Sequence, residues 1–223
     1  YKAVLESFAH FEKAIPMMMT AAGTIPAAKV LVVGAGVAGL QAIATAKRMG
    51  AIVFATDVRM ASKEQVESLG ASFVEVPLEE DNTETKGGYA KELSKDAQER
   101  QRQVMHEHVK KSDVVITTAL IPGKPAPLLV TEEMVADMRA GSVIIDLAAE
   151  NGGNCELTQK DKVINHNQII IDGTSNLPGT MPVHASELYS KNIAAFLTYM
   201  VKEGQLNLDL EDEIISGALY SHN

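Results

Sequence analysis

The stretch that most constrains the fold covers residues 29–57 and reads KVLVVGAGVAGLQAIATAKRMGAIVFATD. After its first lysine, KVLVV is continuously apolar, which is typical of a strand that is buried on both faces. A glycine-rich turn follows, then a helical pattern that stops at Gly50, and then a second apolar run. Two buried strands joined through a helix predict a βαβ unit with parallel strands.

The same alternation continues along the chain. Further strands are predicted at SFVEV, DVVITT, GSVIIDLA and QIIIDG, and helices at residues 62–69, 89–111 and 131–138, the last with Thr131 as its N-cap. Between them, the acidic and polar segment 77–88 is typical of a mobile surface loop. The expected fold class is therefore α/β, with a Rossmann-type doubly wound parallel sheet.

The glycines of the turn have the spacing of a dinucleotide site. Gly34, Gly36 and Gly39 lie directly between an apolar run and a helix, with Ala35 as a small neighbour. In such a turn the first glycine allows the tight bend, the second lets the backbone approach a pyrophosphate, and the third lets helix and strand pack closely. The alternative interpretation is a glycine-rich turn that binds no ligand. The position of the glycines between a strand and a helix argues against this alternative.

An acid at the end of the second strand indicates which nucleotide would bind. Asp57 lies about twenty residues beyond the turn, where a carboxylate accepts hydrogen bonds from the adenosine ribose hydroxyls. A carboxylate there repels a 2′-phosphate, so the expected cofactor is NAD(H) rather than NADP(H). Arg59 could attract that phosphate instead, but with Asp57 at the ribose we favour stacking of Arg59 on the adenine.

Composition excludes several other classes of function. The net charge of −9 argues against a nucleic-acid surface, which needs a basic stripe. Cys155 is the only cysteine, so there is neither a disulfide framework nor a thiolate metal cluster, and the acids near residue 80 are typical of a solvated loop. The apolar segment 14–28 is too short and too interrupted to cross a bilayer, so no membrane insertion is expected.

A convincing catalytic acid–base pair is missing from the pattern. His106, His108 and His166 are expected to be solvated, and His184 to lie at the start of a helix. Asp146 follows a predicted strand at the ligand-binding edge, where capping of nearby N–H groups is at least as good an interpretation as catalysis. No catalytic residue and no metal ligand is therefore predicted.

The two ends of the chain do not continue the alternation. Residues 1–15 show helical spacing up to Pro16, and after Gly173 come a loop, a long helix at about 185–202 and the acidic LDLEDEII segment. We expect residues 1–26 to be a helix and linker from a second domain, with the methionines at 17–19 packed at the junction. Residues 27–175 would form the NAD(H)-binding Rossmann domain, and 176–223 the return segment and C-terminal helices of the second domain. The first residue is Tyr1, which suggests a fragment or a processed product.

Several motifs together resemble a known family. These are VGAGVAGLQAIATAKRMGAIVFATDVR, KEQVESLGA, GGYAKE, ITTALIPGKPAPLLVTEEMV and GSVIIDLAAENGGN. They are similar to the NAD(H)-binding first domain (alpha or alpha-1 component) of proton-translocating NAD(P)+ transhydrogenase. The similarity extends from PMMMTAAGT, which starts at residue 16, to DLEDEIISGAL, which ends at residue 219. Alanine dehydrogenase is a related family with the same fold and similar IPG and LPG patterns, but GGYAKE and IATAKRMGA favour transhydrogenase.

The resemblance implies that NADH bound here passes hydride to NADP+ on a separate domain, while a membrane domain couples the transfer to proton movement. Such a transfer needs no acid–base pair. It also implies a homodimer, partners that carry the NADP(H)-binding and membrane domains, and a place on the cytoplasmic face of a bacterial inner membrane. An Arg-Gln-Asp loop of the family lies N-terminal to this chain, so we expect the chain alone to be incomplete for catalysis.

The resemblance also assigns the cofactor-binding residues. The turn residues Gly34 and Gly39 are expected from their spacing, and the family implies contacts from Ala35, Gly36, Val37, Asp57, Val58, Arg59, Gly88, Tyr89, Thr118, Ala119 and Leu120. Gly88 and Tyr89 would belong to a loop that closes over the nucleotide. Two other hypotheses stay open: an alanine dehydrogenase-like amino-acid dehydrogenase, and a redox-sensing NAD(H)-binding module without turnover.

Overall fold

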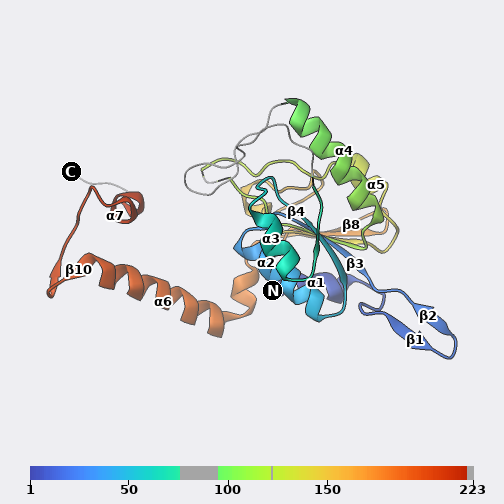
Figure 1. Ribbon diagram of the computed structural model, residues 1–223, viewed down its shortest axis with the longest axis horizontal. Coiled ribbons are helices and arrows are strands. Elements are labelled where there is room, and N and C mark those ends of the chain that lie inside the picture. The colour runs from blue at the N-terminus through green and yellow to red at the C-terminus, as the bar shows by residue number, and fades with distance from the viewer. Residues whose placement is uncertain (76–94, 122, 220–223) are drawn as a thin grey trace. The chain divides into compact units, whose positions relative to one another are not determined.

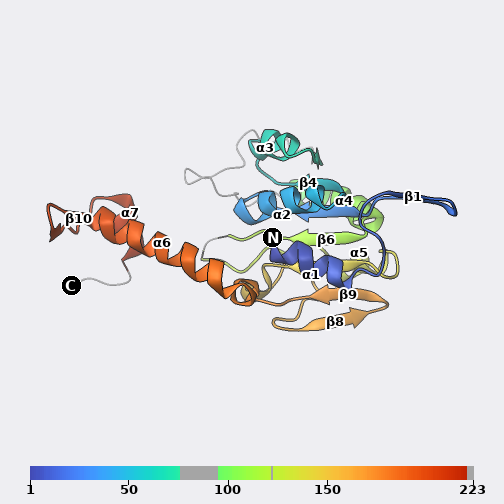
Figure 2. The same ribbon diagram turned by 90° about the horizontal axis from the view of Figure 1, so that it is seen from below.

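The computed structural model describes residues 1–75, 95–121 and 123–219, and within them one large sheet has the strand order β5-β4-β3-β6-β7-β9-β8 (Figures 1 and 2). Neighbouring strands are parallel except for β8 and β9. The order of β5-β4-β3-β6-β7-β9 is the 3-2-1-4-5-6 order of a doubly wound fold, which confirms the predicted class. The strands are β3 (Lys29–Val33), β4 (Ile52–Thr56), β5 (Ser72–Phe73), β6 (Val114–Thr117), β7 (Val143–Asp146), β8 (Val163–His166) and β9 (Ile169–Asp172).

Strand β8 is not among the predicted strands. It is an edge strand in which exposed and half-buried residues alternate, so it has no continuous apolar run. Its connection to β9 is Asn167–Gln168, and both residues have positive φ angles, of 51° and 66°. Positive φ at both central residues is characteristic of a tight type I′ hairpin turn, which favours asparagine. The asparagine between VINH and an apolar run is the signal that could have indicated this hairpin.

Helices cover both faces of the sheet. Helices α4 (Lys95–Lys111) and α5 (Glu132–Ala136) lie on one face, above the sheet in Figure 1, and contribute Met105, Val109 and Met134 to a buried cluster. From the sheet, Leu31 and Ile144 are among the residues that complete this cluster. Helices α1 (Lys2–His10) and α2 (Val37–Arg48) pack on the other face, and α3 (Ser62–Ser68) lies beside α2 and β5 (Figure 2).

Helix α1 packs on the main sheet. It contacts β6, β7 and α2, and its residues Ala3, Val4 and Ser7 are buried. Residues Tyr1–Ser175 accordingly form one compact unit. How the chain divides between the domains of a longer protein stays a prediction.

A two-stranded hairpin of β1 (Met18–Thr20) and β2 (Gly23–Ile25) projects from this unit (Figure 1). All of its strand residues are exposed. Met17 and Met19 are 60% and 80% exposed. That these methionines pack at a junction with a second domain stays a prediction, because only the residues of this chain are present to cover them.

The second unit comprises residues Asn176–Asn223 and is described as far as residue 219. It contains the 3₁₀ helix η2 (Leu177–Thr180), the long helix α6 (Pro182–Met200), a short pair of strands β10 (Val201–Lys202) and β11 (Gln205–Leu206), and helix α7 (Glu213–Ala218). Asp212 caps α7 by accepting hydrogen bonds from the N–H groups of Ile214 and Ile215. The predicted long helix is confirmed, whereas the short helix starts only at the end of the LDLEDEII segment and continues to Ala218.

Candidate dinucleotide site

The carboxyl ends of four parallel strands meet at one edge of the sheet. The register pairs Val33 of β3 with Thr56 of β4 on one side and with Thr117 of β6 on the other, and Thr117 pairs with Asp146 of β7. Strand β3 is followed by a turn and then by α2, which lies on one face of the sheet. Strand β6 is followed by α5, which lies on the opposite face. This is the point where the winding reverses, and ligands of doubly wound folds bind there.

The turn after β3 is fixed by its first and third glycines. Gly34 has a φ of +98°, and a Cβ there would lie 2.6 Å from Thr118 Oγ1. A Cβ on Gly39 would lie 1.8 Å from the Gly34 carbonyl oxygen, because α2 starts directly against the strand end. Side chains at these two positions are incompatible with the observed packing.

Gly36 differs from the other two glycines of the turn, because the surrounding protein leaves room for a side chain. A Cβ on it would meet no atom within 4 Å, so packing does not require glycine here. Gly36 is the N-cap of α2 and provides no side-chain cap, and Val37, the first helical residue, is 91% exposed. The first N–H groups of a helix have no partner within the helix. The open α2 N-terminus is thus suited to bind an anion, and the glycine leaves room for a pyrophosphate to approach.

Asp57 is tied both to the turn and to Arg59. Its Oδ2 accepts a hydrogen bond from the Ala35 N–H at 2.7 Å, and its Oδ1 accepts one from the Arg59 N–H at 2.8 Å. The Arg59 guanidinium adds a bidentate pair, with Nε to Oδ1 and Nη2 to Oδ2 both at 2.9 Å. Burial alone would raise the pKa of Asp57, but the hydrogen bonds from Arg59 and Ala35 and the charge of Arg59 outweigh it and lower the pKa. The carboxyl group is therefore ionised.

Residues after β6 support the turn from the other side. The Thr118 N–H donates to the Val33 carbonyl at 2.8 Å and its hydroxyl to the Gly34 carbonyl at 3.0 Å. Thr118 therefore contacts the turn directly. Ala119 is half-buried, and Leu120 is 48% exposed at the same edge.

Two buried polar residues that order this edge were not predicted as site residues. Asn154 is fully buried, and its side chain accepts from the Ala119 N–H at 3.0 Å and donates to the carbonyls of Ala119 and Pro127 at 2.9 and 2.8 Å. The carboxylate of Asp146 accepts hydrogen bonds from both N–H groups of the 154–155 segment, at 2.7 and 3.0 Å. Residues 151–154 (NGGN) lie next to β6 only because of the fold. No local sequence signal therefore marks Asn154 as a residue of this site.

Asp146 is saturated with donors. Besides those two N–H groups it accepts from the hydroxyls of Thr117 at 2.9 Å and Thr158 at 2.7 Å and from the Ala148 N–H at 2.9 Å. The capping interpretation of Asp146 is therefore confirmed in geometry. Both oxygens of the carboxylate are thus engaged in holding the segments around β6, β7 and residues 154–158 together.

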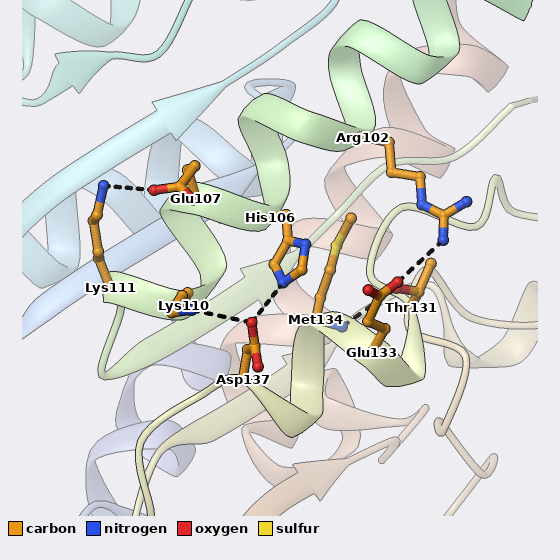
Figure 3. A network of polar contacts seen from close by, with 9 residues as sticks. All are labelled: Arg102, His106, Glu107, Lys110, Lys111, Thr131, Glu133, Met134 and Asp137. Atoms are coloured by element: carbon orange, nitrogen blue, oxygen red, sulfur yellow. Dashed lines mark hydrogen bonds and ion pairs between the residues drawn. The ribbon is translucent and has the colours of Figure 1, made fainter.

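The histidines on α4 lie away from the turn. His106 Nε2 is 3.1 Å from Asp137 Oδ2, which also accepts from Lys110 Nζ at 3.2 Å, so these residues form part of an exposed polar network between α4 and α5 (Figure 3). His108 is half-buried rather than solvated as expected, with its ring 5.8 Å from that of Phe54, and burial lowers its pKa. His184 lies in the first turn of α6, as predicted.

Some expected site residues cannot be placed. Gly88 and Tyr89 lie outside the described residues, as does the predicted loop 77–88. Val58 is half-buried next to Asp57. Among the residues that the structure covers, no group of His, Cys, Asp and Glu is arranged to hold a metal ion. No helix in the same part of the chain is long and apolar enough to cross a membrane.

The chain is similar to transhydrogenase subunits over almost all of its length. It is 54% identical over 220 residues to an NAD(P) transhydrogenase subunit alpha component of Rhodospirillum rubrum, covering 97% of this chain and 57% of the relative. The crystal structure of transhydrogenase from Sinorhizobium meliloti superposes with a TM-score of 0.81 at 50% identity, over 97% of this chain and 57% of that one. The chain thus spans little more than half the length of these relatives.

Alanine dehydrogenases are more distant. That of Staphylococcus epidermidis is 33% identical over 165 residues, which covers 71% of this chain and 38% of the enzyme. The sequence model of one family, described as "Alanine dehydrogenase/PNT, C-terminal domain", matches residues 3–223. Together with the doubly wound sheet and its glycine turn, this match shows that the chain belongs to the alanine dehydrogenase/PNT C-terminal domain family.

Proposed function

We propose that this chain is the NAD(H)-binding part of a proton-translocating NAD(P)+ transhydrogenase. In this role NADH bound at the turn donates hydride to NADP+ on a separate domain, and a membrane domain couples the transfer to proton movement. One observation carries the proposal: an open α2 N-terminus, tied through Ala35 to the carboxylate of Asp57, lies at the switch point of the sheet. The identity to transhydrogenase alpha subunits supports this choice within the family.

The residues would divide the nucleotide between them. The N–H groups around Gly36 and Val37 bind the pyrophosphate, and Asp57 accepts hydrogen bonds from the adenosine ribose. The backbone at 118–120 lines the nicotinamide side, with Asn154 holding it in place through Ala119. The chemistry that NADH supplies when bound is hydride donation from its nicotinamide ring. Gly88 and Tyr89 would close over the bound nucleotide.

The polar groups at this edge fit a role in positioning. Asp146 and Asn154 are buried and fully engaged with backbone and hydroxyl donors, so neither is arranged to move a proton. Hydride transfer between two nicotinamides needs no proton at the reacting carbons, whereas oxidation of an amine or alcohol does. Positioning by Asp146 and Asn154 is consistent with transhydrogenation, and the identity to transhydrogenase subunits, not these two residues, favours it over amino-acid oxidation.

The proposed partners are a second copy of the chain, the NADP(H)-binding domain and the membrane domain, at the cytoplasmic face of a bacterial inner membrane. None of the residues of α6 is buried, and Val183, Leu188 and Tyr189 are 63–75% exposed. A helix with such an apolar surface normally packs on a further chain or domain, which supports the homodimer. Residues 1–26 and 176–223 would then belong with the remainder of the full-length subunit, around a binding domain at 27–175.

The test uses the full-length subunit. It is mixed with the separately purified, NADP(H)-loaded partner, and hydride transfer between nicotinamide analogues is followed by absorbance. We expect transfer that depends on both proteins. Absence of transfer with a folded and loaded partner would refute the proposal, and alanine-dependent reduction of NAD+ by the subunit alone would favour the amino-acid dehydrogenase. NADH binding without either activity would favour a sensing module.

A further inference from the structure

The expected discrimination against NADPH rests on the negative charge of Asp57, but the structure shows that this charge is not isolated. The two carboxylate oxygens face the guanidinium of Arg59 in a bidentate pair, with N···O distances of 2.9 Å. The Asp57 side chain is only 7% exposed and that of Arg59 22% exposed. A phosphate near the ribose position would therefore meet a carboxylate paired with a guanidinium rather than a bare carboxylate.

Repulsion by Asp57 is weak under these conditions. The field of a carboxylate is largely cancelled by a cation in contact with it, and water and salt screen what remains. The guanidinium itself is well suited to a phosphate, because its planar fork of N–H donors binds phosphate as it binds a carboxylate. In related sites an arginine near the ribose accommodates the 2′-phosphate of NADP. The donors that a 2′-phosphate would need are thus present, but Asp57 holds them.

We propose that Asp57 and Arg59 select the nucleotide as one unit, in which Asp57 excludes NADPH mainly by holding the Arg59 guanidinium in the bidentate pair. Ala35 takes part, because its N–H fixes Asp57 Oδ2 and thereby keeps the pair against the phosphate turn. This inference deepens the proposed function and rests on dinucleotide binding at this turn. It makes Arg59 a specificity-determining residue, whereas the sequence alone favoured stacking on the adenine.

The experiment measures dissociation constants for NADH and NADPH by nucleotide fluorescence on the full-length subunit. It compares the wild type with Asp57→Asn, Arg59→Gln and the double variant. Asp57→Asn weakens the hold on Arg59, so NADPH affinity should rise about tenfold or more, the size of one hydrogen-bonded charge contact. In the double variant this gain should disappear, because the phosphate acceptor is gone.

Simple repulsion by Asp57 predicts the opposite for the double variant. If the double variant keeps the gain in NADPH affinity, removal of the negative charge is sufficient and our proposal is overturned. Arg59→Gln alone gives a second test: it leaves Asp57 as an uncompensated charge, so the preference for NADH over NADPH should increase. An unchanged or reduced preference in Arg59→Gln would also overturn the proposal, even if the Asp57 variants fail to fold.

A matched control is Asp137→Asn, which removes the same charge from an exposed ion pair at the C-cap of α5. It should leave both affinities unchanged, and a gain in NADPH affinity there would mean that overall charge, not the pair, is responsible. Failure of dinucleotide binding at this turn would look different, since the wild type would then bind neither nucleotide, and failure of the transhydrogenase role would appear in the hydride-transfer assay rather than in these affinities.

Discussion

The glycines of the turn have different roles, as the space around a Cβ added at each position shows. At Gly39 the added Cβ would collide with the Gly34 carbonyl, whereas at Gly36 it would enter open space. Gly36 has a φ of −75°, which suits alanine, so its backbone does not require glycine either. Packing thus explains one glycine, and the proposed ligand explains the other.

These two positions give a paired prediction. Gly39→Ala should lower the free energy of unfolding by about 1–3 kcal/mol, as overpacked sites do. Gly36→Ala should unfold like the wild type but bind NADH about tenfold more weakly or worse, because its Cβ lies where the pyrophosphate would approach. Urea denaturation and fluorescence titration measure the two effects. Normal NADH affinity in Gly36→Ala would contradict the assigned role of the turn.

Asp146 gathers donors from several segments, so its neutral isostere should be costly. Asp146→Asn places an amide N–H₂ group against backbone N–H donors of the 154–155 segment, and each buried donor left unsatisfied costs about 1–3 kcal/mol. We expect a loss of about 2 kcal/mol or more in urea denaturation. The exposed Asp137→Asn change should stay within about 0.5 kcal/mol of the wild type. Equal stability of both variants would show that the Asp146 hydrogen bonds contribute little.

The thiol of Cys155 should be inert in the folded protein. It is 2% exposed, and burial raises its pKa to about 11. Because the folded pKa exceeds the ordinary value of 9.0, the contribution of the thiol to stability is complete below about pH 9 and is lost as pH rises towards 11. Labelling by a disulfide reagent at pH 8 should require urea. Rapid labelling without urea would contradict the buried position.

At the scale of elements, α5 shows how local signals and packing combine. Thr131 caps it by accepting from the Met134 N–H at 3.3 Å, as its sequence predicted, and Figure 3 shows this contact beside the exposed ion pairs to α4. Exposed ion pairs of this kind contribute little to stability. The cap and the buried Met134 therefore hold this short helix in place.

The cap can be tested separately. Thr131→Ala should destabilise the protein by about 1 kcal/mol, whereas Thr131→Ser keeps the acceptor oxygen and should stay close to the wild type. The midpoint of urea denaturation measures both variants. If serine fails to rescue the loss caused by alanine, the β-branched methyl group of Thr131 and not its hydroxyl is what stabilises α5.

On the scale of the whole molecule, the binding turn and the main core lie in one unit. The sheet, its buried cluster and the residues of the turn all fall within Tyr1–Ser175. In the second unit, Leu177 and Ile215 are the buried apolar residues among those described. We therefore expect a protein ending at Ser175 to unfold cooperatively and to bind NADH. A broad, non-cooperative thermal transition by circular dichroism would show that the second unit is needed for the fold.

The sequence by itself determined the elements whose signals are local. The apolar runs of β3 and β6, the cap at Thr131 and the stop at Gly50 depend on a few neighbouring residues, so pattern alone located them. The glycine spacing and Asp57 likewise predicted a dinucleotide turn. Strand β8 was missed because a half-exposed edge strand has no continuous apolar run to mark it.

Only the tertiary structure decided which distant residues meet. The packing of α1 on the sheet and the clamp of Asn154 on Ala119 join segments far apart in the chain, through contacts that no local pattern encodes. The pairing of Arg59 with Asp57 is close in sequence, yet it depends on the bend after β4 that turns both side chains together. A sequence specifies which groups are present, whereas the charge that a ligand meets depends on how the fold pairs them.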